Sequence, residues 1–167
     1  RVDRRQRQMC IRDSIGIGRR DYNNEQFRDQ VKASIQTYVK DTDRIDEFMT
    51  HVFYHKTDVS DKESYQSLLQ FSERLDSEFA LGGNRLFYLA MAPQFFGVIS
   101  DYLKSSGLTQ TTGFKRLVIE KPFGSDLKSA ESLNNQIRRS FKEEEIYRID
   151  HYLSLIHISE PTRQAEI

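Results

Sequence analysis

The stretch Lys115-Arg-Leu-Val-Ile-Glu-Lys-Pro-Phe-Gly124 decides the fold of this chain. Its apolar centre is typical of a strand that is buried on both faces of a parallel sheet. Pro122 ends the strand, because proline has no backbone N–H to donate to a sheet. A helical pattern follows, and Ser125 is its expected cap. The expected inner face of this helix is Leu127, Ala130, Leu133, Ile137 and Phe141.

Strand and helix patterns alternate on both sides of this stretch. Further strands are predicted at 15–18, 52–58, 85–92 and 146–150, and the apolar run 85–92 is also expected to be buried on both faces. Helices are predicted at 24–39, 43–51, 60–79 and 95–106. Alternation of this kind predicts an α/β fold with a doubly wound parallel sheet and helices on both faces.

The first predicted helix shows the pattern clearly. Residues 23–25, Asn-Asn-Glu, offer a cap at its start. Its apolar residues recur at helical spacing and predict an inner face of Phe27, Val31, Ile35 and either Tyr38 or Val39.

Composition narrows the class of protein. The chain has 167 residues, enough for one domain, and 37% of them are hydrophobic. No apolar run reaches the length of a membrane span, so no membrane partner is expected. The single cysteine, Cys10, favours a reducing compartment, and we expect a cytoplasmic protein. Neither Cys10 nor the histidines show metal-ligand spacing, so no metal site is predicted.

The charged residues are balanced at 25 against 25, but their distribution is uneven. Residues 1–14 hold five arginines and two aspartates. One interpretation is a basic arm that binds nucleic acid. The other is a disordered or foreign tail, which we favour because no aromatic or groove-reading element accompanies the arginines. We therefore expect no nucleic-acid partner, and a nucleotide- or nucleic-acid-binding module remains the alternative function.

Arg19 and Arg20 follow the first predicted strand. In a complete dinucleotide-binding sheet this strand would be the second, because the strand with the glycine-rich fingerprint would lie upstream of Ile15. An arginine at the end of the second strand accommodates the 2′-phosphate of NADP. A guanidinium suits a phosphate because it donates two parallel hydrogen bonds. The alternative is a solvated arginine pair in a loop. The glycine-rich fingerprint of such folds is missing, and Gly16-Ile-Gly18 does not replace it because no third glycine opens a helix. The predicted Rossmann-like sheet is therefore incomplete.

Polar residues also end the last two predicted strands. Lys121, held by the bend at Pro122, can donate to a sugar hydroxyl or a cofactor amide, or it is an ordinary lysine at a strand end. His151 can bind a phosphate or be structural. Asp150 can orient a histidine for general-base catalysis, but not its neighbour His151, because adjacent strand residues point to opposite faces.

These residues form a recognisable pattern. Ile119-Glu-Lys-Pro-Phe-Gly-Ser-Asp-Leu127, followed by Ile146-Tyr-Arg-Ile-Asp-His-Tyr-Leu153, closely resembles the glucose-6-phosphate dehydrogenase family. Asn84-Arg-Leu-Phe-Tyr-Leu-Ala90 and Gly16-Ile-Gly-Arg19 also resemble strands of that family. The similarity covers residues 15–153.

The resemblance implies an oxidoreductase of glucose metabolism that uses NADP. It would transfer a hydride from glucose 6-phosphate to NADP and give 6-phosphogluconolactone, the first step of the pentose phosphate pathway. For the cofactor, the resemblance implies that Arg19 holds the 2′-phosphate with help from Arg20. It also implies that Asp58 lies near the adenosine half.

For the substrate, the resemblance implies that Lys121, positioned by Pro122, touches both glucose 6-phosphate and the nicotinamide. His151 and Tyr152 would bind the sugar phosphate. Asp150 would pair with the general-base histidine of the family. A full-length member of the family is expected to be a homo-oligomer.

The chain also departs from the family pattern. The glycine-rich loop is missing, and Ser154-Leu155 stand where the family has Gly-Lys. The family's general-base histidine belongs to a second domain that has no counterpart here. We interpret 1–14 and 154–167 as non-family tails around a partial NADP-binding domain at 15–153. The chain is therefore expected to be a piece of the enzyme and inactive by itself.

Overall fold

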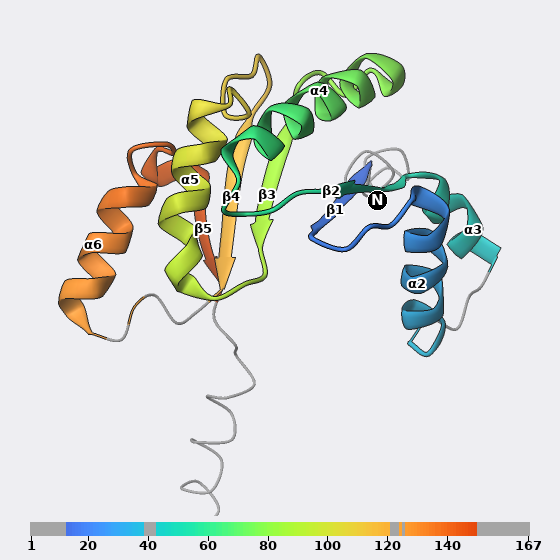
Figure 1. Ribbon diagram of the computed structural model, residues 1–167, viewed down its shortest axis with the longest axis horizontal. Coiled ribbons are helices and arrows are strands. Elements are labelled where there is room, and N and C mark those ends of the chain that lie inside the picture. The colour runs from blue at the N-terminus through green and yellow to red at the C-terminus, as the bar shows by residue number, and fades with distance from the viewer. Residues whose placement is uncertain (1–12, 39–42, 121–123, 125, 150–167) are drawn as a thin grey trace, which may run out of the picture. The chain divides into compact units, whose positions relative to one another are not determined.

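The computed structural model describes residues 13–38, 43–120, 124 and 126–149. The chain divides into two compact units, Arg1–Gly82 and Gly83–Ile167, and each contains its own parallel sheet. Strands and helices alternate in both units, as Figure 1 shows. The predicted α/β class and the predicted order of elements are confirmed.

The first unit is built on the parallel strands β1 (Ser14–Gly18) and β2 (Val52–Lys56). Their register pairs Ser14 with Val52 and Gly18 with Lys56, so the two strands end at the same level. Beyond them, the Thr57 N–H donates to the carbonyl of Gly18 at 2.9 Å and extends the ladder. The carboxyl ends of β1 and β2 therefore form one edge, where α/β sheets bind ligands.

Two helices connect these strands, α2 (Asn24–Gln36) and α3 (Asp43–Thr50). Asn23 and Gln26 form a reciprocal capping box, which confirms the cap predicted at the start of α2. Tyr38, one of the two residues expected to end the inner face, is exposed, because the helix ends at Gln36. The core on this side of the sheet is Phe27, Val31, Ile35, Ile45, Phe48, Met49 and Val52.

The opposite face of β2 packs against α4 (Lys62–Phe79), which Asp61 caps by accepting from the Glu63 N–H. Phe53 makes ring contacts with Phe71 and Phe79 of this helix. The buried residues of α4 are Tyr65, Leu68 and Leu75. The first unit thus has helices on both faces of its sheet, as predicted.

The two glycines of β1 have a packing role. A Cβ on Gly16 would overlap the ring of Phe27 in α2, and a Cβ on Gly18 would lie 3.0 Å from the Tyr54 hydroxyl. The glycines therefore let α2 and β2 approach the strand closely. This agrees with the interpretation that Gly16-Ile-Gly18 is not a phosphate-binding fingerprint.

The second unit has the parallel order β3-β4-β5, formed by β3 (Arg85–Leu89), β4 (Lys115–Glu120) and β5 (Ile146–Ile149). A short 3₁₀ helix η1 (Pro93–Phe95) leads into α5 (Phe96–Ser105), and α6 (Leu127–Ile137) precedes η2 (Glu143–Glu145). The core between the sheet and these helices includes Leu89, Phe96, Ile99, Leu103, Leu117, Ile119, Ile137, Phe141 and Ile146.

The prediction that 85–92 is buried on both faces is wrong. β3 ends at Leu89, and its residues alternate, with Leu86 57% exposed and Tyr88 50% exposed. Alternation arises because the side chains of a strand point to opposite faces, and within the described part of the second unit the helices α5 and α6, which pack together, cover one face only. The central strand β4 does fit the prediction, since Leu117, Val118 and Ile119 are all buried.

The start of α6 also differs from the prediction. Its cap is Asp126, which accepts from the Ser129 N–H at 2.7 Å, rather than Ser125. Leu127 was expected to face inward but is 75% exposed, because it occupies the first turn of the helix. Phe141 is buried as predicted, although it lies beyond the end of α6.

In the described part of the chain, the strands form two separate parallel sheets, β1-β2 and β3-β4-β5. Among the described residues, no helix is long and apolar enough to cross a membrane.

Candidate functional site

The candidate site lies where the chain leaves β1, at residues 19–22. The Tyr54 hydroxyl donates to the carbonyl of Arg20 at 2.7 Å, which ties this turn to β2. Asn24 accepts from the Tyr54 N–H at 2.8 Å and ties the start of α2 to the same strand. Burial raises the pKa of Tyr54, so its hydroxyl stays protonated and remains a donor across the neutral range. The turn therefore has a fixed place beside the sheet edge.

The guanidinium of Arg20 is hydrogen-bonded to a tyrosine side chain. Its guanidinium donates to the Tyr22 hydroxyl at 3.0 Å, and that hydroxyl also accepts from Gln30 at 3.0 Å. The hydrogen bond with Arg20 lowers the pKa of Tyr22, and the same bond raises the pKa of Arg20. Tyr22 packs edge-on against Tyr54 with ring centroids 5.6 Å apart. Arg20 thus supports the turn, and any ligand must compete with Tyr22 for it.

Arg19 is different. Its side chain is exposed and makes no hydrogen bond, ion pair or ring contact with any other described part of the chain. An unengaged guanidinium directly after a strand at this edge is placed to receive an anion. The predicted role of Arg19 and Arg20 in holding a 2′-phosphate remains a prediction, and the structure shows that only Arg20 of the two is engaged by a described side chain.

Asp58 lies at the same edge, in the turn between β2 and α4. Its carboxylate accepts from the Ser60 N–H at 2.9 Å, and its carbonyl accepts from the Asp61 N–H at 3.0 Å. These bonds give Asp58 a structural role in the turn that starts α4. Its contact with an adenosine remains a prediction.

Sequence reasoning missed Lys56, the last residue of β2. Its ammonium lies 3.5 Å from the carboxylate of Asp21, and both side chains are largely exposed. No local sequence signal marks it, because Lys56 reaches the site through the parallel register, which places the last residue of β2 beside the last residue of β1. The site therefore holds the cations Arg19, Arg20 and Lys56 and the carboxylates Asp21 and Asp58.

His55 lies on the opposite face of β2 from Lys56. Its Nδ1 is 2.7 Å from the hydroxyl of the buried Thr57, and its Nε2 is 3.3 Å from the Ser67 hydroxyl. The ring of Phe71 covers it with centroids 5.3 Å apart. Burial lowers the pKa of His55, because an imidazolium is poorly solvated there.

The lowered pKa of His55 predicts a loss of stability in mild acid. As the pH falls below about 6.5, the unfolded chain takes up a proton at this residue before the folded chain does. The contribution of His55 is therefore complete above that pH and is lost as the pH falls through the folded-state pKa. NMR titration should place His55 below the ordinary histidine pKa, with His55→Gln to assign its signals. Titration at or above the ordinary value would contradict the prediction.

The other predicted site residues cannot be placed. Lys121, Pro122, Asp150, His151 and Tyr152 lie outside the described residues. Their roles therefore remain predictions. The same holds for the arginine-rich segment 1–12 and for 154–167.

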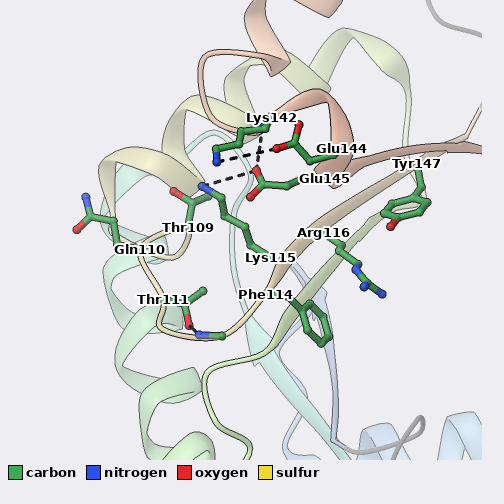
Figure 2. Close-up of a pocket in the computed structure, with 11 residues that line it drawn as sticks. Thr109, Gln110, Thr111, Phe114, Lys115, Arg116, Lys142, Glu144, Glu145 and Tyr147 are labelled. Atoms are coloured by element: carbon green, nitrogen blue, oxygen red, sulfur yellow. Dashed lines mark hydrogen bonds and ion pairs between the residues drawn. The ribbon is translucent and has the colours of Figure 1, made fainter.

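A polar cavity of about 420 Å³ lies in the second unit, at the amino ends of β4 and β5 (Figure 2). Lys115 lies 3.8 Å from the carboxylate of Glu145, and Lys142 lies 3.9 Å from that of Glu144. Arg116 stacks 4.5 Å above the ring of Phe114 and lies 5.8 Å from that of Tyr147. The cations of this cavity are thus engaged by its own carboxylates and rings, and the edge is not the one where α/β sheets bind ligands.

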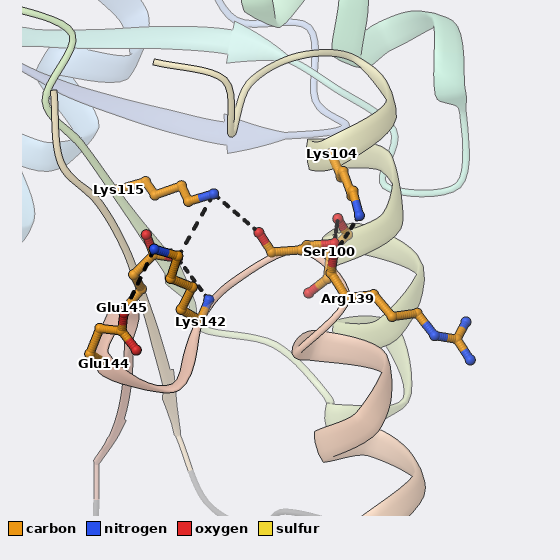
Figure 3. Close-up of polar contacts among 8 residues, drawn as sticks. Ser100, Lys104, Lys115, Arg139, Lys142, Glu144 and Glu145 are labelled. Carbon is orange, nitrogen blue, oxygen red and sulfur yellow. Dashed lines mark hydrogen bonds and ion pairs between the residues drawn. The ribbon is translucent and has the colours of Figure 1, made fainter. Parts of the chain in front are cut away.

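Polar contacts beside this cavity fix the segment before β5 (Figure 3). Lys104 donates to the carbonyl of Arg139 at 2.6 Å, and the Ser140 hydroxyl donates to the carbonyl of Ser100 at 2.8 Å. Through these two hydrogen bonds, Arg139 and Ser140 are tied to α5. We interpret the cavity and these contacts as structural, because they fix the segment that leads into β5.

Comparisons with known proteins give the family. The family model described as "Glucose-6-phosphate dehydrogenase, NAD binding domain" matches residues 5–158. The glucose-6-phosphate 1-dehydrogenase of Bacillus subtilis (strain 168) is 52% identical over 139 residues, and that of Leuconostoc mesenteroides is 40% identical over the same length. Each alignment covers 83% of this chain, but only 28% and 29% of the relative.

Solved structures agree with the sequence comparisons. A glucose-6-phosphate dehydrogenase in complex with its substrate glucose-6-phosphate superposes with a TM-score of 0.74 at 36% identity, covering 84% of this chain and 30% of that chain. The enzyme from Mycobacterium avium gives a TM-score of 0.71 at 31% identity, covering 89% of this chain and 31% of that chain. The parallel sheets, the arginine turn and these matches lead to one conclusion: the chain belongs to the glucose-6-phosphate dehydrogenase family and corresponds to part of its NAD-binding domain.

Proposed function

We propose that this chain is the coenzyme-binding part of an NADP-dependent glucose-6-phosphate dehydrogenase. The complete enzyme would oxidise glucose 6-phosphate to 6-phosphogluconolactone, as the first step of the pentose phosphate pathway in the cytoplasm. Membership of the family supports the reaction class, and the chain spans less than a third of the length of these relatives. Bound NADP would supply the acceptor for the hydride that leaves C1 of the sugar.

The observation that carries the choice of NADP is the guanidinium of Arg19 at the carboxyl edge of β1, which is exposed and engaged by no other described residue. The turn that carries it is fixed by Tyr54, so the guanidinium stands close to the sheet edge. In this fold that place belongs to the 2′-substituent of the adenosine ribose. A phosphate there gains paired charge-assisted hydrogen bonds, which a hydroxyl cannot match.

The remaining roles follow from the family motifs. Lys121, positioned by Pro122, would contact both glucose 6-phosphate and the nicotinamide. His151 and Tyr152 would bind the sugar phosphate, and Asp150 would orient a general-base histidine. That histidine has no counterpart in this chain, so we expect the chain to bind NADP without reducing it. The complete enzyme is proposed to be a homo-oligomer.

Arg19→Ala tests the proposal on the 167-residue chain. We expect the variant to lose about tenfold to hundredfold in affinity for NADP, because a charge-assisted contact to the phosphate is removed. Its affinity for NAD, which has no 2′-phosphate, should stay within about twofold. Isothermal titration calorimetry of both cofactors measures the two constants.

Arg20→Ala is the matched control. We expect a smaller loss of NADP affinity than in Arg19→Ala, because Arg20 is held by Tyr22. Equal affinity of the natural chain for NADP and NAD, unchanged in Arg19→Ala, would overturn the choice of cofactor. Reduction of NADP by glucose 6-phosphate with this chain alone would contradict the expected inactivity.

A further inference from the structure

The turn after β1 carries a carboxylate beside its arginines. Asp21 is 87% exposed, and it forms an ion pair with Lys56 at 3.5 Å. A carboxylate can accept from a ribose 2′-hydroxyl, but it repels a phosphate at the same place. The net charge around Asp21 therefore bears on which adenosine nucleotide the turn accepts.

Lys56 is placed to change that charge. Its Cα lies beside that of Gly18, the residue that precedes Arg19, at the spacing of neighbouring strands, about 4.8 Å. Paired residues of adjacent strands point to the same face, and Gly18 has no side chain there to separate Lys56 from the turn. The Tyr54 hydroxyl, from the same face of β2, holds the carbonyl of Arg20. The lysine and the turn are thus fixed on one framework.

The ion pair itself leaves Lys56 available. A contact of 3.5 Å between side chains that are 57% and 87% exposed is weak and easily exchanged. The ammonium has three N–H donors, and among the described residues Asp21 is its one partner. A phosphate held by Arg19 can therefore take a hydrogen bond from Lys56 while the lysine still screens Asp21.

We propose that Lys56 is a specificity-determining residue for adenosine nucleotides that carry a 2′-phosphate. It donates to that phosphate and offsets the repulsion from Asp21. This inference rests on the proposed function, since it concerns the same 2′-phosphate that Arg19 binds. With Lys56 neutralised, Asp21 faces the ligand without its cation, and the turn favours a free 2′-hydroxyl.

The test compares adenosine 2′,5′-bisphosphate with adenosine 5′-monophosphate on the 167-residue chain by calorimetry. The dissociation constant of the monophosphate divided by that of the bisphosphate gives the preference for the 2′-phosphate. We expect Lys56→Gln to reduce this ratio about threefold to tenfold at low ionic strength, and added salt to remove most of the difference. Lys56→Arg keeps the charge and should keep the preference. Circular dichroism shows whether each variant is folded, and the exposed position 56 is expected to tolerate both substitutions.

Asp21→Asn completes a double-mutant cycle. Alone it should raise the preference for the bisphosphate about twofold to fivefold, because a repulsive charge is removed. If Lys56 offsets the charge of Asp21, Lys56→Gln should reduce the preference by a smaller factor in the Asp21→Asn background than in the natural chain, and this departure from additivity measures the coupling between the two residues. An unchanged preference in Lys56→Gln, with the preference lost in Arg19→Ala, would overturn this inference and leave the proposed function standing. An unchanged preference in both variants would overturn both.

Discussion

Phe141→Ala should lower the free energy of unfolding of the second unit by about 3–5 kcal/mol. Phe141 is 1% exposed and meets the ring of Phe87 with centroids 5.7 Å apart. Its ring also lies 5.9 Å from the ammonium of Lys115. Removing the ring leaves a cavity between β3 and the segment that follows α6, because packed helices and strands cannot close it fully. A loss of this size is a large share of the stability of a typical domain.

Urea unfolding followed by circular dichroism measures the loss, and hydrogen exchange of the β4 amides assigns it to the second unit. Phe114→Ala is the matched control. Phe114 is 45% exposed and contacts Arg116, so the same truncation should cost less than about 1 kcal/mol. Equal losses in the two variants would show that Phe141 is not a core residue.

Gly124→Ala should cost about 2–5 kcal/mol, the sum of a left-handed backbone and an overlap with backbone atoms. Gly124 has φ of +87°, which residues with a Cβ rarely adopt. An added Cβ would also lie 2.7 Å from the backbone nitrogen of Ala130, which cannot move without distorting the first turns of α6. The glycine that ends Glu120-Lys-Pro-Phe-Gly124 is thus required by the backbone.

Gly97→Ala separates this effect from the general effect of adding a methyl group. The new Cβ would overlap only the side-chain amide of Gln136, which can rotate away. Gly97 lies inside α5, where alanine is the better helix former by about 0.5–1 kcal/mol. Its melting temperature should therefore stay close to that of the natural chain. Equal melting temperatures for Gly124→Ala and Gly97→Ala would show that the backbone does not require a glycine at position 124.

The sequence predicts the elements well because its local signals agree with the fold. The Asn23 cap, the face of Phe27, Val31 and Ile35, and the buried strand β4 all follow from periodicity and capping, and all are found. Local signals say less about which faces are covered. The apolar run of β3 looks like that of β4, yet Leu86 and Tyr88 are exposed, because the described helices of the second unit cover only the other face of the sheet.

The site could be predicted only in part. Arg19 and Arg20 were found because they follow a strand, but their different roles depend on Tyr22, which lies two residues beyond Arg20 and takes up its guanidinium. Lys56 was missed because its partner Asp21 is 35 residues away in the chain, and only the parallel register brings the two together. Pairing across a crossover is a long-range property that no local pattern contains.

The hydrogen bond from Tyr54 to the carbonyl of Arg20 has a consequence for protein engineering. The anchor is a backbone atom, so the path of the turn does not depend on which side chains stand at 19 and 21. Tyr54 itself is buried between β1 and α2. The backbone path of the turn and the charge at the site are therefore determined by separate residues. Cofactor preference can be redesigned by recombining side chains at 19, 21 and 56 on an unchanged scaffold, with Tyr54 kept constant throughout the library.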